Sequence, residues 1–597
     1  MSENQNDEPI FDGEIKIKIE SSDQSQINVE ETVRNIASGL ESAGENLAQR
    51  AEEAMKAFVQ KMQSEETQSA VQNVAASTAA TVGEVGKAVF NMAGGALSGL
   101  ASLGATFLSV GAEALNNYAQ KEQEYADRQA LLEEIDAYVD EVWPSVLNDL
   151  ATLVAIPSVA NSDNAVEGSP YGVEAHKALS CGLDICGMLG LEPHDCDGWI
   201  GYADLPGKSS KYIATIAHLD VVPAGTGWSS DPYSMIFRDG YLMGRGVLDD
   251  KGPAVLSMYA AHYFARQVFS GRELPYTLRV ILGSDEEVGM NDVDYYLKHF
   301  EEPAFLFTPD AEYPVCCGEK GRVEGKFTSS NFWNGIIKDF NGGTVSNAIP
   351  SLATCTIEAD IAALPEAEGI DIEPSSGSLV KLTAHGIGGH ASRPEGTVNA
   401  IGMIVNYLVD NFIVMGDELR FCELLRRIFA SSDGSTLGIA ATDDLFDPLT
   451  CIGGTIKFEN GRLVQTVDIR YPKSTNGDYI TNRLAQIASV YDATFAQTSD
   501  MVPFYIDPQN PCVQALIDAY NEVTGKKEKP FTIGGGTYAR HFKNAVSFGP
   551  EEPGELLPEW VGTIHGPDEG VSEELLRRSL KIYIYALEKL MATEIAE

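Results

Sequence analysis

Five side chains of the kinds that bind metal ions are spread along the chain, each after an apolar, strand-like run or in a glycine-rich turn. They are His218, Asp249, Glu287, Asp310 and His565. Two imidazoles and three carboxylates form a mixed nitrogen and oxygen donor set that suits zinc or manganese. With one carboxylate as a bridge and two end ligands for each ion, the set would hold two metals. Glu286 stands beside Glu287, where a general base is needed, so the residue types favour a hydrolase.

Three of these positions follow predicted strands. His218 ends the run YIATIAH, Glu287 follows YTLRVILG, and Asp310 follows AFLFTP. In an open parallel sheet, the loops beyond the carboxyl ends of the strands converge on a crevice where ligands bind. One such residue would be an ordinary solvated loop residue, whereas three of them together indicate a shared site.

Neighbouring residues have expected supporting roles. Asp220 lies two residues beyond His218 on the same side of an extended segment, so its carboxylate is expected to accept the second ring N–H. That bond would leave the other ring nitrogen free for a metal. Asp249 precedes a helix predicted from Lys251, a junction that suits a carboxylate shared by two ions roughly 3.5–4 Å apart. Water between such ions has a pKa near about 7, and Glu286 would take its proton and deliver it to a departing amine.

From about Tyr125 onward, strand-like and helical runs alternate, which is typical of an α/β fold with a mostly parallel sheet. A charged amphipathic helix is predicted over 126–152, and a last long helix is expected from Ser572, a good N-cap residue. From about 325 to 500 the pattern changes to strands with intervening helices, which indicates an inserted α+β unit. The predicted domains are an N-terminal extension (1–125), a catalytic domain in two parts (126–324 and 503–597) and an inserted domain (325–502).

Residues 1–125 differ in composition, with no Trp and much Ala, Gly, Ser, Gln and Glu. Apolar residues between Val29 and Met62 recur at three- and four-residue steps, which predicts a helix. Residues 88–112 carry no charge and are long enough to cross a bilayer, but their polar residues fall in one sector, which favours an amphipathic helix. We expect this helix to associate with another helix; membrane contact and a disordered extension are less favoured alternatives.

Length and charge limit the classes of protein that fit. At 597 residues the chain is expected to form two or three domains. Its formal net charge of -45 argues against nucleic acid as a partner, because phosphate would be repelled. The polar, acidic start lacks the basic and apolar regions of a secretory signal, and the nine Cys follow no regular framework. We therefore expect a cytoplasmic protein with reduced thiols, the adjacent pair Cys316 and Cys317 included.

The segments around the candidate ligands resemble a known family. HLDVVP, GRGVLDDKGP, SDEEVGM, TPDAEYP and IHGPDEG are similar to the signature segments of the dinuclear zinc peptidases that include carnosinases, carboxypeptidase G, aminoacylase and acetylornithine deacetylase. The GEKG and GGGTYAR segments resemble those of PepV-like bacterial dipeptidases. The resemblance spans about residues 127 to 595 in order and does not cover residues 1–125.

The resemblance implies a role for each matching residue. His218 and Asp310 would hold one metal, and Glu287 and His565 would hold the other. Asp249 would bridge the two ions. Glu286 would act as the base, with Asp220 as the partner of the His218 ring. Zinc is the expected metal, and a carboxylate-rich site also accepts manganese or cobalt.

The inserted domain resembles the lid of this family. GIGGHASRPEGTVNA is similar to the lid segment that supplies a His to the scissile carbonyl, here His390, where a donor stabilises the developing oxyanion. Asn347 and Arg470 match polar lid residues, and the planar fork of Arg470 suits a substrate carboxylate. Gly535 and Gly536 of GGGTYAR would line the cleft with backbone N–H groups. In the PepV-like subgroup the enlarged lid substitutes for a dimer partner, which implies a monomeric catalytic unit.

The resulting hypothesis is a cytoplasmic metallodipeptidase. Metal-bound hydroxide would attack the peptide bond of a short peptide, with Glu286 as general base and Arg470 on the free carboxylate. An N-acyl-amino-acid deacylase or desuccinylase is the alternative, since both reactions cleave an amide next to an amino-acid carboxylate; the GEKG and GGGTYAR segments favour the dipeptidase. A non-catalytic scaffold is less favoured, because all five ligands and Glu286 are present.

Overall fold

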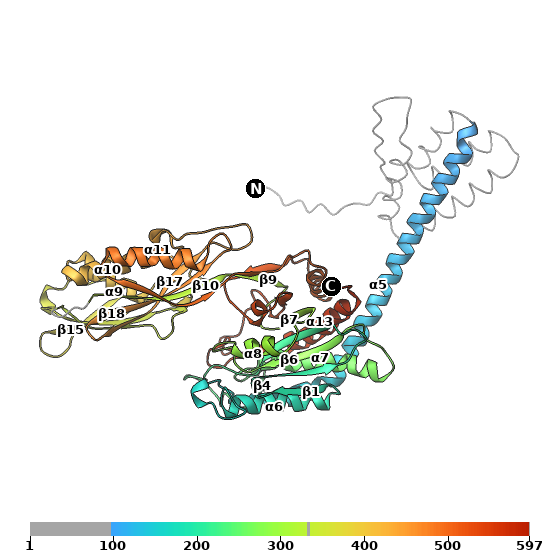
Figure 1. Cartoon of the computed structure of the whole chain (residues 1–597), viewed down its shortest axis with the longest axis horizontal. Coiled ribbons are helices and arrows are strands. Elements are labelled where there is room, and N and C mark those ends of the chain that lie inside the picture. Colours follow the sequence, from blue (N-terminus) through green and yellow to red (C-terminus); the bar gives the residue numbers. More distant parts are fainter. Residues whose placement is uncertain (1–96, 331–334, 596–597) are drawn as a thin grey trace, which may run out of the picture. The chain divides into compact units, whose positions relative to one another are not determined.

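The computed structural model describes residues 97–330 and 335–595, with side chains from residue 121 onward. The chain divides into two compact units, Met1–Glu134 and Ile135–Glu597. Helix α5 (Leu97–Val154) contains residues of both, so the helix predicted over 126–152 is confirmed (Figure 1). The helix predicted between Val29 and Met62, and residues 88–96 of the uncharged stretch, lie outside the described residues. Among the helices within the described ranges, none combines the length and apolar character that a bilayer crossing needs.

The first sheet of the second unit lies at the centre of an α/β arrangement. Its strands are β1 (Glu192–Cys196), β2 (Ile200–Leu205), β3 (Tyr212–His218), β6 (Thr277–Gly283), β7 (Phe305–Thr308), β9 (Cys316–Glu319), β20 (Phe504–Tyr505), β21 (Phe531–Ile533) and β22 (Ala545–Ser547). Their order is β1-β2-β6-β3-β7-β22-β9-β20, with β21 paired to β9. The central strands β6, β3, β7 and β22 are parallel, whereas β1, β2 and β20 pair antiparallel with their neighbours. The sheet is therefore mixed, with the predicted parallel arrangement at its centre.

Helices cover both faces of this sheet. Every residue of β3 is buried, as expected for a strand with a helix layer on each side. α7 (Lys251–Phe269) packs on β3 and β6, and α6 (Val173–Met188) packs on β1, β2 and β6. α13 (Glu573–Ala592) packs on α7 and on α12 (Pro511–Thr524). On the other face, Ala214 and Ile216 share a core with Val293 of α8 (Asn291–His299) and Tyr538 of η4 (Tyr538–His541). The carboxyl ends of the central strands remain free to present side chains.

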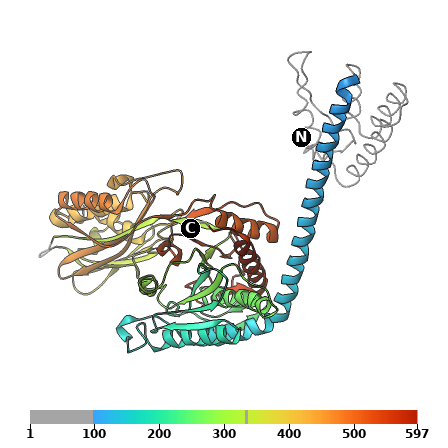
Figure 2. The ribbon, with the colours of Figure 1, turned by 45° about the vertical axis from the view of Figure 1, so that its right-hand side comes forward.

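The second sheet is antiparallel and carries helices on one face. Its strands are β10 (Gly321–Thr328), β11 (Ile337–Gly342), β13 (Leu352–Glu358), β14 (Ile370–Pro374), β15 (Leu379–His385), β17 (Thr450–Glu459), β18 (Arg462–Tyr471) and β19 (Thr494–Met501). They follow the order β14-β15-β13-β11-β17-β18-β10-β19. Both views of the ribbon place α9 (Ala400–Asp410), α10 (Gly416–Phe429) and α11 (Gly477–Val490) on the same side of these strands (Figures 1 and 2).

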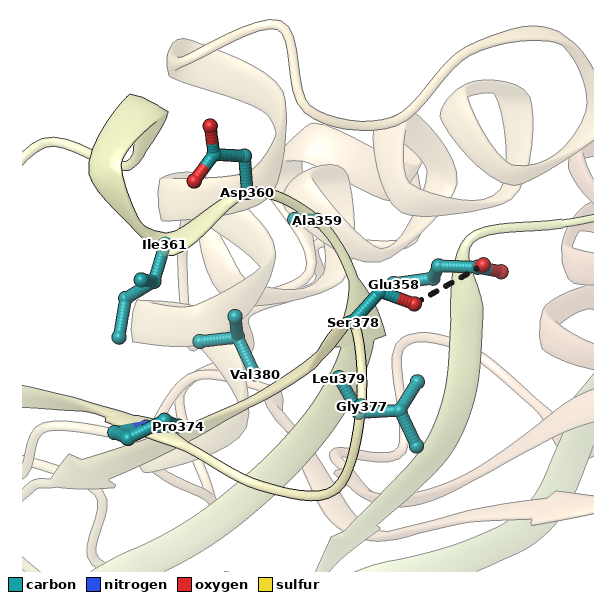
Figure 3. Close-up of a pocket in the computed structure, with 9 residues that line it drawn as sticks. All are labelled: Glu358, Ala359, Asp360, Ile361, Pro374, Gly377, Ser378, Leu379 and Val380. Atoms are coloured by element: carbon teal, nitrogen blue, oxygen red, sulfur yellow. Dashed lines mark hydrogen bonds between the residues drawn. The ribbon is translucent and has the colours of Figure 1, made fainter.

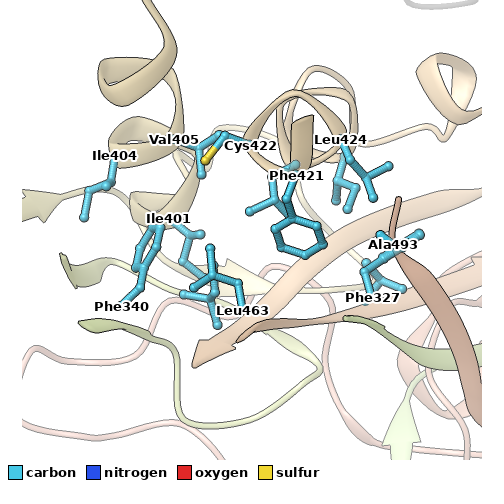
Figure 4. Close-up of a cluster of buried hydrophobic side chains, with 14 of the residues drawn as sticks. Phe327, Phe340, Ile401, Ile404, Val405, Phe421, Cys422, Leu424, Leu463 and Ala493 are labelled. Carbon is cyan, nitrogen blue, oxygen red and sulfur yellow. The ribbon is translucent and has the colours of Figure 1, made fainter. Parts of the chain in front are cut away.

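The two faces of the second sheet differ in chemistry because side chains alternate along a strand. On β18, Leu463 and Ile469 join the core that also contains Ile401 of α9 and Phe421 of α10 (Figure 4). Asp468 and its neighbours at two-residue steps lie on the opposite face. The side chains of Asp468 and Arg470 are therefore directed away from the helices.

Short strands complete the fold. β12 (Ala348–Ile349) pairs with β16 (Gly389–His390), and Ile349 and Ala391 cluster with Ile452 of β17. Because Ile452 is the cross-strand partner of Asp468, this pair of strands packs on the helix-free face of the second sheet. The other short elements are β4 (Ile236–Arg238), β5 (Tyr241–Met243), β8 (Ala311–Glu312), β23 (Pro550–Glu551), β24 (Gly570–Ser572), η1 (Ser162–Asn164), η2 (Ile361–Ala363) and η3 (Ser435–Leu437).

Two connections lead from one sheet to the other, and one guanidinium binds both. Lys320 stands between β9 and β10, and Val502 follows β19. Arg540 Nη2 donates to the carbonyl oxygens of Lys320 (3.2 Å) and Val502 (2.9 Å), and Arg540 Nη1 lies 3.6 Å from the buried carboxylate of Glu319. The domain limits at 325 and 502 stay predictions.

Lys251, the first residue of α7, links α7 to the end of α5. Its side chain is fully buried, and Nζ donates to the carbonyl oxygens of Leu153 (2.9 Å) and Ile156 (2.7 Å). A cation suits this position, because the last carbonyl groups of a helix lack partners within the helix and carry partial negative charge.

Replacing Lys251 with Met should lower the free energy of unfolding by about 2–4 kcal/mol, because two buried carbonyl oxygens lose their donor. Urea denaturation followed by tryptophan fluorescence measures this change. Lys208→Met is the matched control: it removes a surface ion pair with Glu273, so it should change the free energy by less than about 1 kcal/mol. Equal losses in the two variants would contradict the interpretation.

Candidate metal centre

The side chain of Asp249 lies between two imidazoles. His218, the last residue of β3, places Nε2 3.0 Å from Asp249 Oδ1, and His565 Nε2 lies 2.9 Å from Asp249 Oδ2. His565 Nε2 is also 3.2 Å from Oε2 of Glu287, which follows β6. Each oxygen of one carboxylate thus faces a different histidine. This is the arrangement expected of a carboxylate shared by two cations.

Asp310, which follows β7, belongs to the same cluster. His218, Asp250 and Asp310 offer donor atoms that all lie within 4.8 Å of one another, and so do His218, Asp249 and Glu287. The structure therefore brings all five predicted ligands together. It adds Asp250, whose Oδ2 accepts the backbone N–H of His218 at 3.1 Å. The second carboxylate of the Asp249–Asp250 pair was the signal for it in the sequence.

The cluster fits a divalent cation. Glu287 Oε1 and Asp250 Oδ1 are buried and have no hydrogen-bond partner, which is costly for a carboxylate oxygen. Burial raises the pKa of Asp310 well above its ordinary value, and the nearby Asp249 carboxylate adds to this effect. Hydrogen bonds with Asp249 and Glu287 raise the pKa of His565 to about 10. Two imidazoles and several carboxylates, some with unpaired oxygens, form a donor set that suits a hard or borderline cation.

Asp220 contacts the His218 ring and the loop after β6. His218 Nδ1 lies 2.9 Å from the main-chain carbonyl oxygen of Asp220 and 3.5 Å from its carboxylate. The ring N–H lies nearer to the carbonyl oxygen than to the carboxylate, and the role of the Asp220 carboxylate as partner of the ring stays a prediction. The carboxylate accepts the backbone N–H groups of Glu286 (3.3 Å) and Glu287 (3.2 Å). Asp220 thus joins the His218 ring to the loop after β6.

Glu286 is partly buried beside the cluster. Burial raises the pKa of its carboxyl group well above the ordinary value, and the Asp310 carboxylate raises it further. A carboxylate with a raised pKa is a stronger proton acceptor, which suits the predicted role of a base.

Two predicted residues of the inserted domain, Asn347 and His390, lie at the paired short strands β12 and β16. Asn347 directly precedes β12, and its main-chain carbonyl oxygen accepts the backbone N–H of Ala391 (2.9 Å). His390 is the last residue of β16. His390 Nδ1 lies 2.8 Å from Ser392 Oγ. Partial burial lowers the pKa of His390, and the positive charges of Arg470 and His565 lower it further.

Arg470 is buried and already engaged. Its Nε and Nη2 donate to the carboxylate of Asp468 at 2.6 and 3.1 Å, and its Nη1 donates to the carbonyl oxygen of Gly534 at 3.0 Å. The fork predicted to clamp a substrate carboxylate is thus occupied by Asp468, while each terminal nitrogen retains one further N–H. Gly534 contributes a carbonyl group, and in the same loop Gly535 is partly buried and Gly536 is exposed.

A second arginine shares Asp468 and was missed in the sequence. Arg322 on β10 stands directly opposite Arg470, and its Nε donates to Asp468 Oδ2 at 2.9 Å. Arg322 also pairs with Glu324, the residue opposite Asp468. The polar residues at two-residue steps in both strands were the available signal, but only the strand register places them side by side.

A hollow in the second sheet lies apart from these residues (Figure 3). It is lined by residues of β13, β14, β15 and η2, and Ser378 Oγ donates to Glu358 Oε1 across it at 3.3 Å. None of the predicted site residues lines this hollow, so the cluster of carboxylates and imidazoles around Asp249 remains the candidate site.

Comparison with known proteins agrees with this geometry. Residues 214–589 match the family described as Peptidase family M20/M25/M40. A Beta-Ala-Xaa dipeptidase of Lactobacillus delbrueckii subsp. lactis is 30% identical over 470 residues, covering 75% of this chain and 97% of that protein. The putative dipeptidase YtjP of Bacillus subtilis (strain 168) is 29% identical over 465 residues, covering 74% and 97%.

A solved structure supports the fold assignment. The structure of the di-peptidase Dug1p from Saccharomyces cerevisiae has a TM-score of 0.50 and 13% identity, covering 77% of this chain and 99% of that one, which indicates a common fold. The family match spans more than half of the sequence and includes every predicted metal ligand. This chain therefore belongs to peptidase family M20/M25/M40 and is a hydrolase that acts on peptide bonds.

Proposed function

We propose that this chain is a metal-dependent dipeptidase that hydrolyses the peptide bond of dipeptides and other short peptides. The observation that carries the proposal is the carboxylate of Asp249 between the imidazoles of His218 and His565, beyond the ends of parallel strands. The substrate class is supported by the two relatives named as dipeptidases, which are similar to this chain along nearly their whole length.

Two divalent cations are proposed at the cluster. His218 and Asp310 would hold one ion, Glu287 and His565 would hold the other, and Asp249 would hold both. The two-sided contacts of Asp249 and the unpaired buried oxygen of Glu287 support this assignment. Zinc is proposed, with manganese or cobalt as alternatives, because imidazole and carboxylate donors suit all three. When bound, such cations supply the positive charge that polarises a peptide carbonyl and acidifies water.

Glu286 is proposed as the general base. Its carboxylate takes a proton from the attacking water and gives it to the amine nitrogen as the C–N bond breaks. The raised pKa of Glu286 supports this role, because it favours the protonated state that follows the first transfer. Asp220 keeps the Glu286–Glu287 loop in place through its bonds to two backbone N–H groups.

The helix-free face of the second sheet is proposed to bind the substrate. His390 would donate a hydrogen bond to the peptide oxygen as negative charge develops there, with Asn347 beside it. Arg470 would bind the free carboxylate through the N–H groups left after its bonds to Asp468, and Gly535 and Gly536 would line the same cleft. A catalytic unit that works as a monomer is proposed from the resemblance to PepV-like dipeptidases, in which the enlarged inserted domain substitutes for a dimer partner.

A cytoplasmic location is proposed as well. All nine cysteines lie in the part of the chain that the structure describes, and each is a free thiol. Free thiols are typical of a reducing compartment.

The assignment of the shared ligand makes Asp249 and Asp250 a matched pair. Asp249→Asn should weaken ion binding at least about 10-fold, because the carboxylate that faces both histidines is lost. Asp250→Asn should retain two ions per chain with a smaller loss of affinity, because Asp250 is not one of the five proposed ligands and an amide oxygen can still accept the N–H of His218. Elemental analysis after equilibrium dialysis measures both variants. Two tightly bound ions in the Asp249 variant would refute the assignment.

Glu286→Gln should lower kcat for a dipeptide by about 10²–10⁴-fold while the ion content stays at that of the wild type, since the amide cannot accept the proton. Steady-state kinetics measures kcat, and elemental analysis of the same preparation measures the ion content. A fully loaded variant with turnover within about 10-fold of wild type would remove Glu286 from this role.

The substrate class is tested with free dipeptides, amidated dipeptides, and N-acetyl and N-succinyl amino acids on the ion-loaded chain. Free dipeptides should have the highest kcat/KM, and amidation should lower it because the carboxylate contact is lost. Preference for the acylated amino acids would instead indicate a deacylase. Absence of hydrolysis with two ions bound would contradict both activities.

A further inference from the structure

A buried ion pair outside the assigned machinery links the two loops that carry Asp249 and His565. Arg245 and Glu569 are 1% and 0% exposed, and Arg245 Nη1 lies 2.6 Å from Glu569 Oε2. Arg245 comes two residues after β5, and Glu569 comes directly before β24, the antiparallel partner of β5. The strand pairing therefore brings the two residues together.

Glu569 holds the loop that ends in Asp249. Its other oxygen, Oε1, accepts the backbone N–H groups of Gly246 (3.1 Å), Leu248 (3.2 Å) and Asp249 (3.3 Å). Three main-chain donors from four consecutive residues thus converge on one oxygen. The position of the Asp249 backbone is set by this carboxylate, because a short loop with three such bonds has little freedom to move.

Arg245 holds the segment that carries His565. Its Nη2 donates to the carbonyl oxygens of His565 and Gly566, both at 3.2 Å, and its guanidinium lies over the Trp228 ring, 5.2 Å from the centroid. His565 has a φ of 62°, in the left-handed region that costs energy for a residue with a side chain. The hydrogen bond from Arg245 to the His565 carbonyl oxygen therefore helps to hold His565 in this unfavourable backbone conformation.

A purely structural role explains this pair poorly. A fully buried ion pair stabilises a fold weakly, because the cost of removing two charges from water offsets their attraction. The bonds that Arg245 and Glu569 make beyond their own pair go to the main chain of Gly246, Leu248 and Asp249 and to that of His565 and Gly566. By contrast, the pair of Arg279 and Asp204 joins two adjacent strands of the first sheet and contacts neither loop.

We infer that Arg245 and Glu569 are positioning residues that fix the spacing between Asp249 and His565 and thereby set the affinity for the ion proposed between them. The inference rests on the proposed two-ion site. The other ion would share Asp249, but its remaining ligands, His218 and Asp310, follow strand ends that this pair does not contact, so its binding should weaken less. Loss of the pair should affect one ion much more than the other.

The test uses the full chain, stripped of metal and titrated with Zn²⁺ or Mn²⁺ by calorimetry, with elemental analysis of stoichiometry. Glu569→Gln keeps an oxygen for the three N–H groups but removes the charge, and Arg245→Lys keeps the charge but loses the bonds to two carbonyl groups. Both variants should bind one ion about 10–100-fold more weakly and the other within a few-fold of wild type. Added metal ion should restore dipeptide turnover, which a general loss of structure would not allow.

Arg279→Lys is the matched control, because it changes another largely buried arginine–carboxylate pair. It should leave both affinities unchanged. Wild-type affinities for both ions in the Glu569 and Arg245 variants would overturn the inference while the proposed site stands. Equal weakening by Arg279→Lys would also overturn it, and a wild-type chain that binds no ions would refute the proposed function itself.

Discussion

Repulsion between carboxylates gathered in one buried place is the constraint on which the rest of this structure depends. Five of them meet at the ends of the parallel strands: Asp249, Asp250, Glu286, Glu287 and Asp310. Buried negative charges are costly unless cations or hydrogen-bond donors compensate them. Two imidazoles provide part of that compensation, and burial still raises the pKa of several of these groups well above ordinary values. The cluster is thus suited to cations by electrostatics before any ligand is assigned a role.

The main chain supplies much of the order around this cluster. The Asp220 carboxylate binds the N–H groups of the loop after β6, and Glu569 binds those of the loop before α7. In both cases a buried carboxylate takes several main-chain donors, so the loops are held without further side chains. The positions of the proposed ligands Asp249 and Glu287 therefore depend on Glu569 and Asp220, which are not proposed as ligands themselves.

The two faces of the second sheet have different roles, because side chains alternate between the faces along each strand. One face is apolar and carries three helices, while the other presents Arg322, Asp468 and Arg470 beneath the strands that hold Asn347 and His390. Asp468 neutralises part of the charge of two guanidinium groups and orients both. The proposed recognition of a substrate carboxylate on this face would then depend on the N–H groups that Asp468 leaves available.

The amino-acid sequence by itself determined the local elements and the kinds of donor: the run YIATIAH is β3, and Ser572 caps α13 by accepting the N–H of Leu575 at 3.2 Å. Hydrophobic period and cap chemistry act over a few residues, so a sequence pattern is enough to predict them. Only the tertiary structure decided that Asp468 occupies the fork of Arg470 and that the carbonyl group of Asp220 receives the His218 ring. Hydrogen-bond partners are chosen by ångström-scale distances between strands and loops, and these depend on register and packing across the whole chain.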